Sequence, residues 1–400
     1  MTPPLHGIRI LDLSTVFSGP MAATLLCDQG AEVVKVEAPE GDTSRLIGHT
    51  KGDLSSSFIA ANRGKRCIAL DLKTPAARDI VLALVARADV LIENFRPGVM
   101  ARLGLDDADL ARQFPRLVRL SITGFGATGP RAGDKAYDAV IQALGGVAAS
   151  QRDPHTGDPV MLATTVCDKL TALTAAQAVT AALLARERDG QGRRVEVSML
   201  DATLAFQWPD AMYNQVFMDD APAPMPAFGA TQRPWRTADG FVATMVPRQD
   251  EFIALCQALG QPELPQDPRF ASQQARYRNG PALRALLEPV MAQIDTATLE
   301  AACRQHGVPM GVLHEHADVL TDPQVLHNGT LVSLSQGSAG RVRVARAAAL
   351  FDGQALLPRA GAGRLGEHGP AVLAELGFSD AQIAQWVADR VLRLPKPSGD

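Results

Sequence analysis

The chain has 400 residues, more than one ordinary core holds, which predicts at least two domains. Its hydrophobic fraction of 46% and charged fraction of 20% are typical of a folded globular protein and exclude a disordered or fibrous chain. Lys+Arg total 39 against 43 Asp+Glu, and the formal charge of −4 argues against a nucleic-acid partner. Local basic pockets for a phosphorylated ligand remain compatible with this balance.

The five cysteines are widely spaced and form no CxxC pair, so we expect neither a disulfide framework nor a cysteine zinc site. The first residues lack the basic and apolar regions of a secretory signal. The longest apolar helical segment, residues 170–185, is too short to span a bilayer comfortably. These features predict a cytoplasmic protein without a membrane partner.

Strands and helices alternate through the first half of the chain. Residues 8–13 and 31–37 read as strands around a helix at 21–29 that Pro20 opens and Gly30 ends, which is a right-handed βαβ unit. Further strands are predicted at 66–72, 90–93, 117–122 and 195–198, with helices at 76–88, 138–144, 168–188 and 200–217. This pattern predicts an α/β fold in which helices cover both faces of a parallel, Rossmann-like sheet.

The amino-acid composition changes near residue 219, where a proline-rich stretch begins. A hairpin is predicted at 235–246 with Asp239-Gly240 at its turn, and helices follow to about residue 307. Short strands then return at 332–334 and 341–344, before helices at 371–376 and 380–390. We therefore predict a large domain from residues 1–218, a linker at 219–234, a smaller inserted α+β domain at 235–325, and a linker with return to the large domain at 326–400.

The turn after the first strand, residues 14–20, contains Gly19 followed by Pro20. It lacks the GxGxxG glycines that let a pyrophosphate approach the backbone, so we expect no NAD. The turn nevertheless follows a parallel strand, where open α/β sheets bind their ligands. It is a candidate wall of a site for another nucleotide.

Asp168 stands at the start of the helix predicted over 168–188. An aspartate there often only caps free N–H groups. The same position also keeps a carboxylate ionised beside donors that stabilise an oxyanion, as a nucleophile toward an activated acyl group requires. Both interpretations stay open on the residues alone.

Several polar residues lie near predicted strand ends. Each one alone is typical of a solvated surface, but together they would suit a phosphate-bearing cofactor: Lys73, Asn94, Arg96, Arg102, Lys135 and Tyr137. We expect no metal, because His314-Glu315-His316 lacks further ligands at a suitable spacing. GxSxG, Walker A and HExxH motifs are absent from the sequence.

Blocks along nearly the whole chain carry a family resemblance. They are residues 5–12, Gly19-Pro20, 32–37, Gly41-Asp42, 62–66, 70–75, 93–98, Tyr137-Asp138 with Gln142 and Gly145, Asp168, 190–192 and 366–368. In their order and spacing the sequence resembles the class III CoA-transferases, the CaiB/BaiF family that includes formyl-CoA transferases and carnitine CoA-transferases.

The resemblance implies an interlocked homodimer with CoA or acyl-CoA bound as a substrate on the large domain. It implies that Asp168 is the nucleophile, which carries the acyl group as a mixed anhydride and then CoA as a thioester. Because the thioester energy is preserved, no ATP is needed. Carried over residue by residue, the implied CoA contacts are Val16, Leu70, Lys73, Asn94, Phe95, Arg102, Lys135 and Tyr137.

The chain departs from formyl-CoA transferases at three places. Phe17 replaces a glutamine, Ala38 replaces an arginine, and the glycine-rich active-site loop has no equivalent near residues 226–234. We therefore expect Phe17 in the substrate pocket and a larger or less polar acyl group than oxalate or formate. An α-methylacyl-CoA racemase is an alternative, although Tyr137-Asp138 stands where racemases have His-Asp, and tyrosine is a poor acid or base at neutral pH. A non-catalytic nucleotide-binding module is a third possibility.

Overall fold

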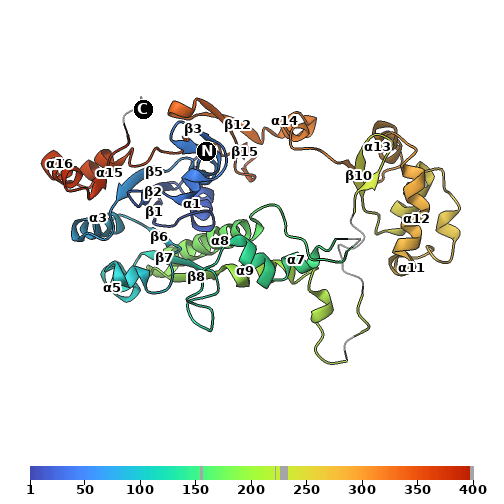
Figure 1. The fold of residues 1–400 in the computed structure, drawn as a ribbon, viewed down its shortest axis with the longest axis horizontal. Helices are drawn as coiled ribbons and strands as arrows, with labels where there is room; N and C mark the ends of the chain where they lie inside the picture. The colour runs from blue at the N-terminus through green and yellow to red at the C-terminus, as the bar shows by residue number, and fades with distance from the viewer. Residues whose placement is uncertain (154–155, 221, 226–232, 397–400) are drawn as a thin grey trace. The chain divides into compact units, whose positions relative to one another are not determined.

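The computed structural model describes residues 1–153, 156–220, 222–225 and 233–396, and it divides into two compact units (Figure 1). The large unit comprises Met1–Pro209 and Asn328–Asp400, and the small unit comprises Asp210–His327. Of the linker predicted at 219–234, residues 221 and 226–232 lie outside the described residues, as does most of the segment compared above with the glycine-rich loop. No helix in the described ranges has the length and apolar character needed to cross a membrane.

A seven-stranded, mainly parallel sheet forms the centre of the large unit, in the order β16-β5-β2-β1-β6-β7-β8. Its parallel strands are β1 (Arg9–Asp12), β2 (Glu32–Glu37), β5 (Arg66–Leu70), β6 (Val90–Glu93), β7 (Val118–Thr123) and β8 (Arg194–Ser198). The mixed α/β sheet expected from the sequence is therefore confirmed. The sequence analysis missed β16 (Leu392–Arg393), which pairs antiparallel with β5 at the sheet edge and is too short to show a pattern.

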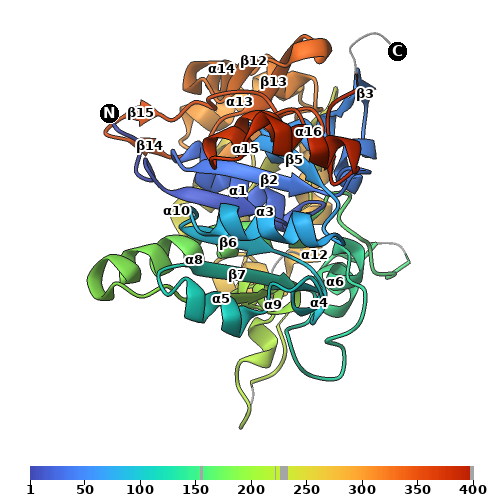
Figure 2. The same ribbon diagram turned by 90° about the vertical axis from the view of Figure 1, so that its left-hand side faces the viewer.

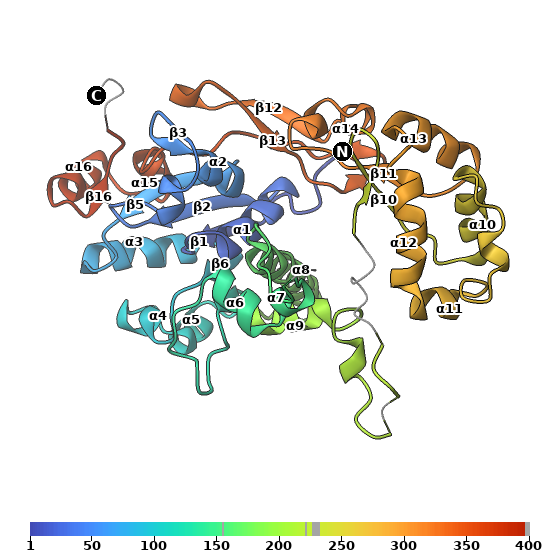
Figure 3. The ribbon, with the colours of Figure 1, turned by 45° about the vertical axis from the view of Figure 1, so that its right-hand side comes forward.

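Helices cover both faces of this sheet. One core contains inward-facing residues such as Ile10, Ile92 and Leu120, packed with α1 (Ser18–Asp28), α8 (Val166–Asp189) and α9 (Met199–Gln207). The other contains Leu11 and Leu91 with α3 (Pro75–Val85), α5 (Asp107–Gln113), α15 (Gly369–Glu375) and α16 (Asp380–Ala388), which lie in front of the strands in Figure 2. Helices α1 and α8 pack against each other and lie next to one another in Figure 3.

The remaining elements of the large unit are short. They are η1 (Thr43–Leu46), β3 (Thr50–Lys51), β4 (Leu54–Ser55), α2 (Ser56–Asn62), α4 (Val99–Arg102), α6 (Asp138–Leu144), α7 (Val147–Ser150), β12 (Leu331–Ser335), η6 (Gly337–Ala339), β13 (Arg341–Ala345), β14 (Leu350–Phe351) and β15 (Gln354–Ala355). Strands β12 and β13 pair antiparallel, and their side chains pack with α2 in a separate cluster. This cluster joins the C-terminal segment to the N-terminal one.

Two helix boundaries differ from the sequence expectation in ways that matter below. The helix expected from residue 21 begins at Ser18. Residues in the first turn of a helix do not donate N–H groups within the helix, so Pro20 fits as its third residue and need not precede it. The helix expected over 200–217 ends at Gln207, and Pro209, two residues later, has no N–H with which to continue the helical hydrogen bonds. Only a short 3-10 turn, η2 (Tyr213–Gln215), follows.

The small unit has a core of its own. Its antiparallel sheet has the order β11-β10-β9 and consists of β9 (Trp235–Arg236), β10 (Phe241–Thr244) and β11 (Met310–Val312). The helical elements are α10 (Gln249–Ala258), η4 (Leu264–Gln266), α11 (Gln273–Arg278), α12 (Gly280–Met291), α13 (Thr296–Gln305) and η5 (Asp318–Leu320), and α14 (Pro323–Asn328) ends at the unit boundary. The expected hairpin is present, and the N–H of Thr237 donates to the carbonyl of Gly240 across its turn (3.0 Å).

Candidate active site

Asp168 lies in the first turn of α8 and is only 8% exposed. The helix forms because residues 166–189 are rich in alanine and leucine, and it ends where Gly190 adopts a left-handed φ of 77°. Its N-cap residue, Thr165, makes no side-chain capping hydrogen bond. A free backbone N–H at this helix end therefore needs an acceptor from elsewhere in the fold.

Asp138 supplies that acceptor from the first turn of α6. Its Oδ1 accepts the backbone N–H of Asp168 (3.0 Å), and its Oδ2 accepts the Nε2 of Gln142 (2.6 Å). The buried Gln142 amide also accepts the N–H of Leu162 (2.9 Å) and donates to the carbonyl of Thr164 (3.2 Å). Helix α6 thus fixes both the approach to α8 and the position of Asp168.

The carboxyl of Asp168 has an unusual protonation equilibrium. Burial raises its pKa from 3.8 to about 7, and the nearby Asp138 carboxylate adds to the rise. Hydrogen bonds from the backbone N–H and the hydroxyl of Ser18 oppose this rise. Ser18 is the first residue of α1, so the carboxylate faces the N-termini of two helices, where negative charge is stabilised.

A cavity of about 240 Å³ opens beside Asp168. Its walls come from the turn after β1, the segment after β6 and the end of β7, all at the carboxyl edge of the parallel sheet. Six of the residues singled out from the sequence by the family resemblance line it together: Val16, Asn94, Phe95, Lys135, Tyr137 and Asp168. Arg96, named above for its charge and as part of the family block 93–98, lines it as well.

Four of the site residues predicted in the sequence analysis do not line this cavity. The Leu70 side chain is fully buried in the core next to β16, so any ligand contact there would have to come from its backbone. Lys73 and Arg102 are exposed beyond the cavity, at the end of the loop after β5 and the end of α4. Phe17 is half-buried and is not among the lining residues, although Val16 on one side and Ser18 on the other are.

Ser18 is the functional candidate that the sequence reasoning missed. The expected helix start at residue 21 put Ser18 in a turn, so its N–H was not counted among the free donors of a helix N-terminus. The signal was present, since Ser18-Gly19-Pro20 has the composition of a helix start. Gly19 is needed there because a Cβ at this position would lie 2.3 Å from the Ser14 side chain.

A larger cavity of about 430 Å³ shares Phe95, Arg96, Pro97 and Thr123 with the first but does not include Asp168. Two of its arginines are already paired, since Arg119 and Arg194 both approach Asp107 (2.7 and 3.9 Å). Among the described residues no group of three or more His, Cys, Asp or Glu side chains could hold a metal ion. Of these two cavities, only the smaller is lined by Asp168, so it is the better candidate for acyl chemistry.

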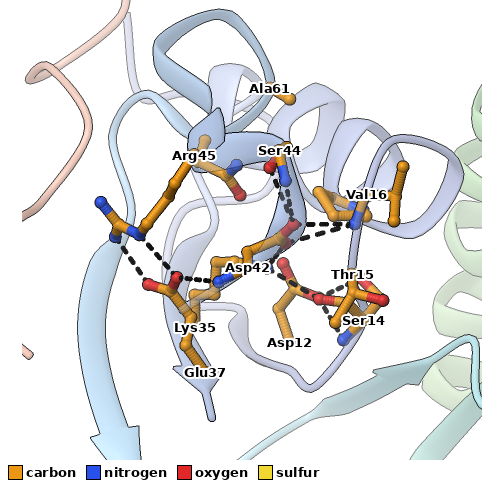
Figure 4. Close-up of polar contacts among 12 residues, drawn as sticks. Asp12, Ser14, Thr15, Val16, Lys35, Glu37, Asp42, Ser44, Arg45 and Ala61 are labelled. Carbon is orange, nitrogen blue, oxygen red and sulfur yellow. Dashed lines mark hydrogen bonds and ion pairs between the residues drawn. The ribbon is translucent and has the colours of Figure 1, made fainter. Parts of the chain in front are cut away.

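Behind the turn after β1 lies a buried cluster of charges (Figure 4). The Lys35 ammonium pairs with Asp42 (3.0 Å), and the Lys65 ammonium pairs with Asp12 (2.8 Å); all four side chains are inaccessible to solvent. The Arg45 guanidinium pairs with Glu37 (2.7 Å) at the edge of the cluster. Each charge thus has an opposite partner, as burial requires.

Comparison with known proteins shows the family to which the chain belongs. The family described as CoA-transferase family III matches residues 5–369. The chain is 36% identical over 388 residues to an acetyl-CoA:oxalate CoA-transferase of Acetobacter aceti, covering 95% of this chain and 97% of that one. It is 34% identical over 385 residues to a succinate–glutarate CoA-transferase of Agrobacterium fabrum, covering 94% and 96%.

Solved structures give the same result. A CaiB/BaiF family protein from Brucella suis matches with a TM-score of 0.82 at 34% identity, covering 94% of this chain and 100% of that one. Rv3272 from Mycobacterium tuberculosis matches with a TM-score of 0.81 at 31% identity, covering 92% and 99%. The chain belongs to CoA-transferase family III and is an enzyme of the transferase type, which confirms the resemblance seen in the sequence.

Proposed function

We propose that this enzyme moves CoA between an acyl-CoA thioester and a free carboxylic acid, with Asp168 as the covalent carrier. The observation that carries the proposal is a buried carboxyl with a pKa of about 7, at the carboxyl edge of the sheet, beside a cavity lined by Asn94, Lys135 and Tyr137. A pKa near neutrality makes the carboxylate a stronger nucleophile than an exposed aspartate, while part of it stays ionised at pH 7.

The reaction we propose has four displacements. The Asp168 carboxylate attacks the donor thioester carbonyl, and the CoA thiolate leaves as a mixed anhydride forms. The thiolate then attacks the aspartyl carbonyl, which releases the donor acid and leaves an enzyme–CoA thioester. The acceptor carboxylate attacks that thioester to form a second anhydride, from which the thiolate takes the new acyl group. No water is consumed, no ATP is needed and the Asp168 carboxylate is regenerated.

Ser18 supports these steps from the N-terminus of α1. Its N–H and hydroxyl donate toward the Asp168 carboxyl, where negative charge appears and disappears in each displacement. Burial of Asp168 keeps water away from the two anhydrides and the thioester, which hydrolysis would otherwise destroy.

We propose that the thioester end of the substrate occupies the 240 Å³ cavity, and that Lys73 and Arg102 bind CoA phosphates outside it. Lys73→Ala and Arg102→Ala should then raise the KM for the CoA thioester and leave kcat largely unchanged. A fall in kcat at unchanged affinity would contradict this assignment. The identity of the two acids is open to experiment, and the relatives named above act on oxalate, succinate and glutarate. Because Phe17 does not line the cavity, it gives no ground for the less polar acyl group expected from the sequence.

An interlocked homodimer, the predicted domain boundaries and a cytoplasmic location are also part of the proposal. Similarity to CaiB/BaiF proteins over nearly the whole chain supports the homodimer. Five free cysteines, all buried, are compatible with a reducing compartment. Light scattering on the purified enzyme should give a mass of two chains, and a monomer would remove the interlocked arrangement.

The decisive experiment combines a substrate screen with trapping of the intermediate. Acyl-CoA thioesters are incubated with a panel of dicarboxylic and branched acids, and new thioesters are identified by mass. Hydroxylamine added during turnover should convert Asp168, and no other carboxyl, to a hydroxamate seen by peptide mass spectrometry. Asp168→Ala should bind CoA yet form no new thioester; full transfer by that variant defeats the proposed mechanism.

A further inference from the structure

The turn between β1 and α1 is held by side chains from other parts of the chain. The carbonyl of Ser14 accepts a hydrogen bond from Lys35 Nζ (2.7 Å), and the N–H of Val16 donates to both oxygens of Asp42 (3.1 and 3.3 Å). Between them, Asn94 bonds both the N–H and the carbonyl of Thr15 (2.8 Å each). Each of these three turn residues therefore has a backbone group bonded to a side chain distant in sequence. Figure 4 shows Lys35 and Asp42 beside the turn.

Val16 adopts a φ of 69°, in the left-handed region. Side chains branched at Cβ are rarely found there, because Cβ approaches the backbone too closely. Such strain persists only where the surroundings over-determine the conformation. The acceptor that holds the N–H of Val16 in this conformation is Asp42.

Asp42 is well suited to this task. Lys35 Nζ lies 3.0 Å from Asp42 Oδ2, and both side chains are fully buried. Burial alone would raise the pKa of Asp42, but the Lys35 ammonium and hydrogen bonds from Ser44 bring it below the usual value. The carboxylate therefore stays ionised, and it binds the turn on one side and η1 on the other.

Neither Asp42 nor Lys35 lines the cavity beside Asp168, so any effect on chemistry passes through the turn. Two residues after Val16 stands Ser18, whose N–H and hydroxyl face the Asp168 carboxyl. We propose that Asp42, held by Lys35, is a positioning residue that locks Val16 in its left-handed conformation and so aims Ser18 at Asp168. This inference rests on the proposed transfer reaction.

The first test is Asp42→Asn, which has almost the same shape but neither the charge nor two equivalent acceptor oxygens. We expect kcat to fall roughly 10- to 100-fold, because the left-handed conformation at Val16 is no longer enforced. The KM for the CoA thioester should change less than about 3-fold, since the interaction affected acts on the transition state.

The second test uses glycine to remove the strain. Glycine adopts a positive φ as readily as a negative one, so Val16→Gly in the Asp42→Asn background should recover at least about half of the lost activity on a logarithmic scale. A purely structural role of Asp42 predicts no such recovery, because removing the isopropyl side chain of Val16 does not repair a buried ion pair. Absence of recovery would therefore overturn the inference.

Asp28→Asn is the matched control. It breaks a buried ion pair of the same unit, with Arg63, that makes no contact with the turn after β1. It should leave kcat unchanged, and a loss of kcat equal to that of Asp42→Asn would contradict a positioning role. If Asp42→Asn does not fold, the double variant Lys35→Met/Asp42→Asn removes both charges together and is expected to show the same loss of kcat.

The outcomes separate this inference from the proposed function. A wild-type enzyme that forms no new thioester and no label on Asp168 refutes the transfer mechanism. If the wild-type enzyme forms a new thioester and is labelled at Asp168, but Asp42→Asn has an unchanged kcat, only the positioning role is refuted. A crystal structure of Asp42→Asn adds a readout independent of activity: residue 16 should leave the left-handed region, and retention of that conformation contradicts the proposal.

Discussion

Asp138 offers a direct way to test how the fold sets the nucleophile. Its carboxylate accepts the N–H of Asp168, and its charge is the second cause, after burial, of the raised pKa of Asp168. Asp138→Asn keeps an oxygen to accept that N–H and removes the charge. The Gln142 amide, which donates to Asp138, still has the carbonyls of Leu162 and Thr164 as partners.

The expected shift follows from the size of the perturbation. The pKa of Asp168 lies at about 7 against an ordinary 3.8, a difference of about 3 units that corresponds to ~4 kcal/mol. A like charge within a few ångströms accounts for about 1 to 2 units of such a rise. Since the ionised form is favoured when the Asp138 charge is absent, the pKa should fall to about 5 to 6.

The assay is the pH dependence of kcat/KM, which reports the essential ionisations of the free enzyme. Activity of the wild type should rise with pH through about 7, and in Asp138→Asn the rise should move 1 to 2 units to lower pH. Asp134→Asn is the control, because Asp134 lines the same cavity but is exposed and lies 3.7 Å from Arg131. If Asp138→Asn shifts the profile by less than about 0.3 unit, as expected for the screened charge of the control, the reasoning is refuted.

Three further predictions concern stability. Ionised Asp168 destabilises the fold because its pKa is raised, so Asp168→Asn should increase the free energy of unfolding at pH 7 by at most about 4 kcal/mol, a gain that disappears in urea titrations as the pH falls to about 4. Gly192→Ala should lower the free energy of unfolding by roughly 1–3 kcal/mol, measured by thermal unfolding, because a Cβ there would lie 2.1 Å from the carbonyl oxygen of Leu117. Gly133→Ala is the control, since a Cβ there has nothing within 4 Å, and equal losses of stability in the two variants would contradict the prediction. Lys65→Met should lower the free energy of unfolding by about 3–5 kcal/mol, because it leaves the Asp12 carboxylate buried without its ion-pair partner. The double variant Asp12→Asn/Lys65→Met should recover part of this stability, and a double variant no more stable than Lys65→Met would contradict the prediction.

Much of the fold could be predicted because its signals are local. A helix was predicted to begin at residue 76, and in the structure Thr74 caps α3 with Pro75 as its first residue. The alternation of apolar strands and helices was enough to predict a mainly parallel α/β sheet. Asp168 could be named as a candidate because a carboxylate at a helix start has a restricted set of roles, and the family blocks favoured one of them.

Other features could not be read from neighbouring residues. Asp138 and Asp168 are 30 positions apart, and Asp42 and Val16 are 26 apart, yet each pair is joined by hydrogen bonds in the folded chain. The two-residue strand β16 is recognisable only because β5 provides the partner for its backbone. The pKa of Asp168 depends on burial and on a neighbouring charge, neither of which exists before the chain has packed.

The sequence by itself determined the class of fold, the family and the identity of the candidate nucleophile, because helix caps, strand periodicity and motif spacing are properties of contiguous residues. The tertiary structure alone decided which candidates share a cavity, that Ser18 begins a helix facing Asp168, and that a buried ion pair holds the turn between them. The physical reason is that hydrogen bonds and charges act over a few ångströms, and only packing brings distant segments within that range.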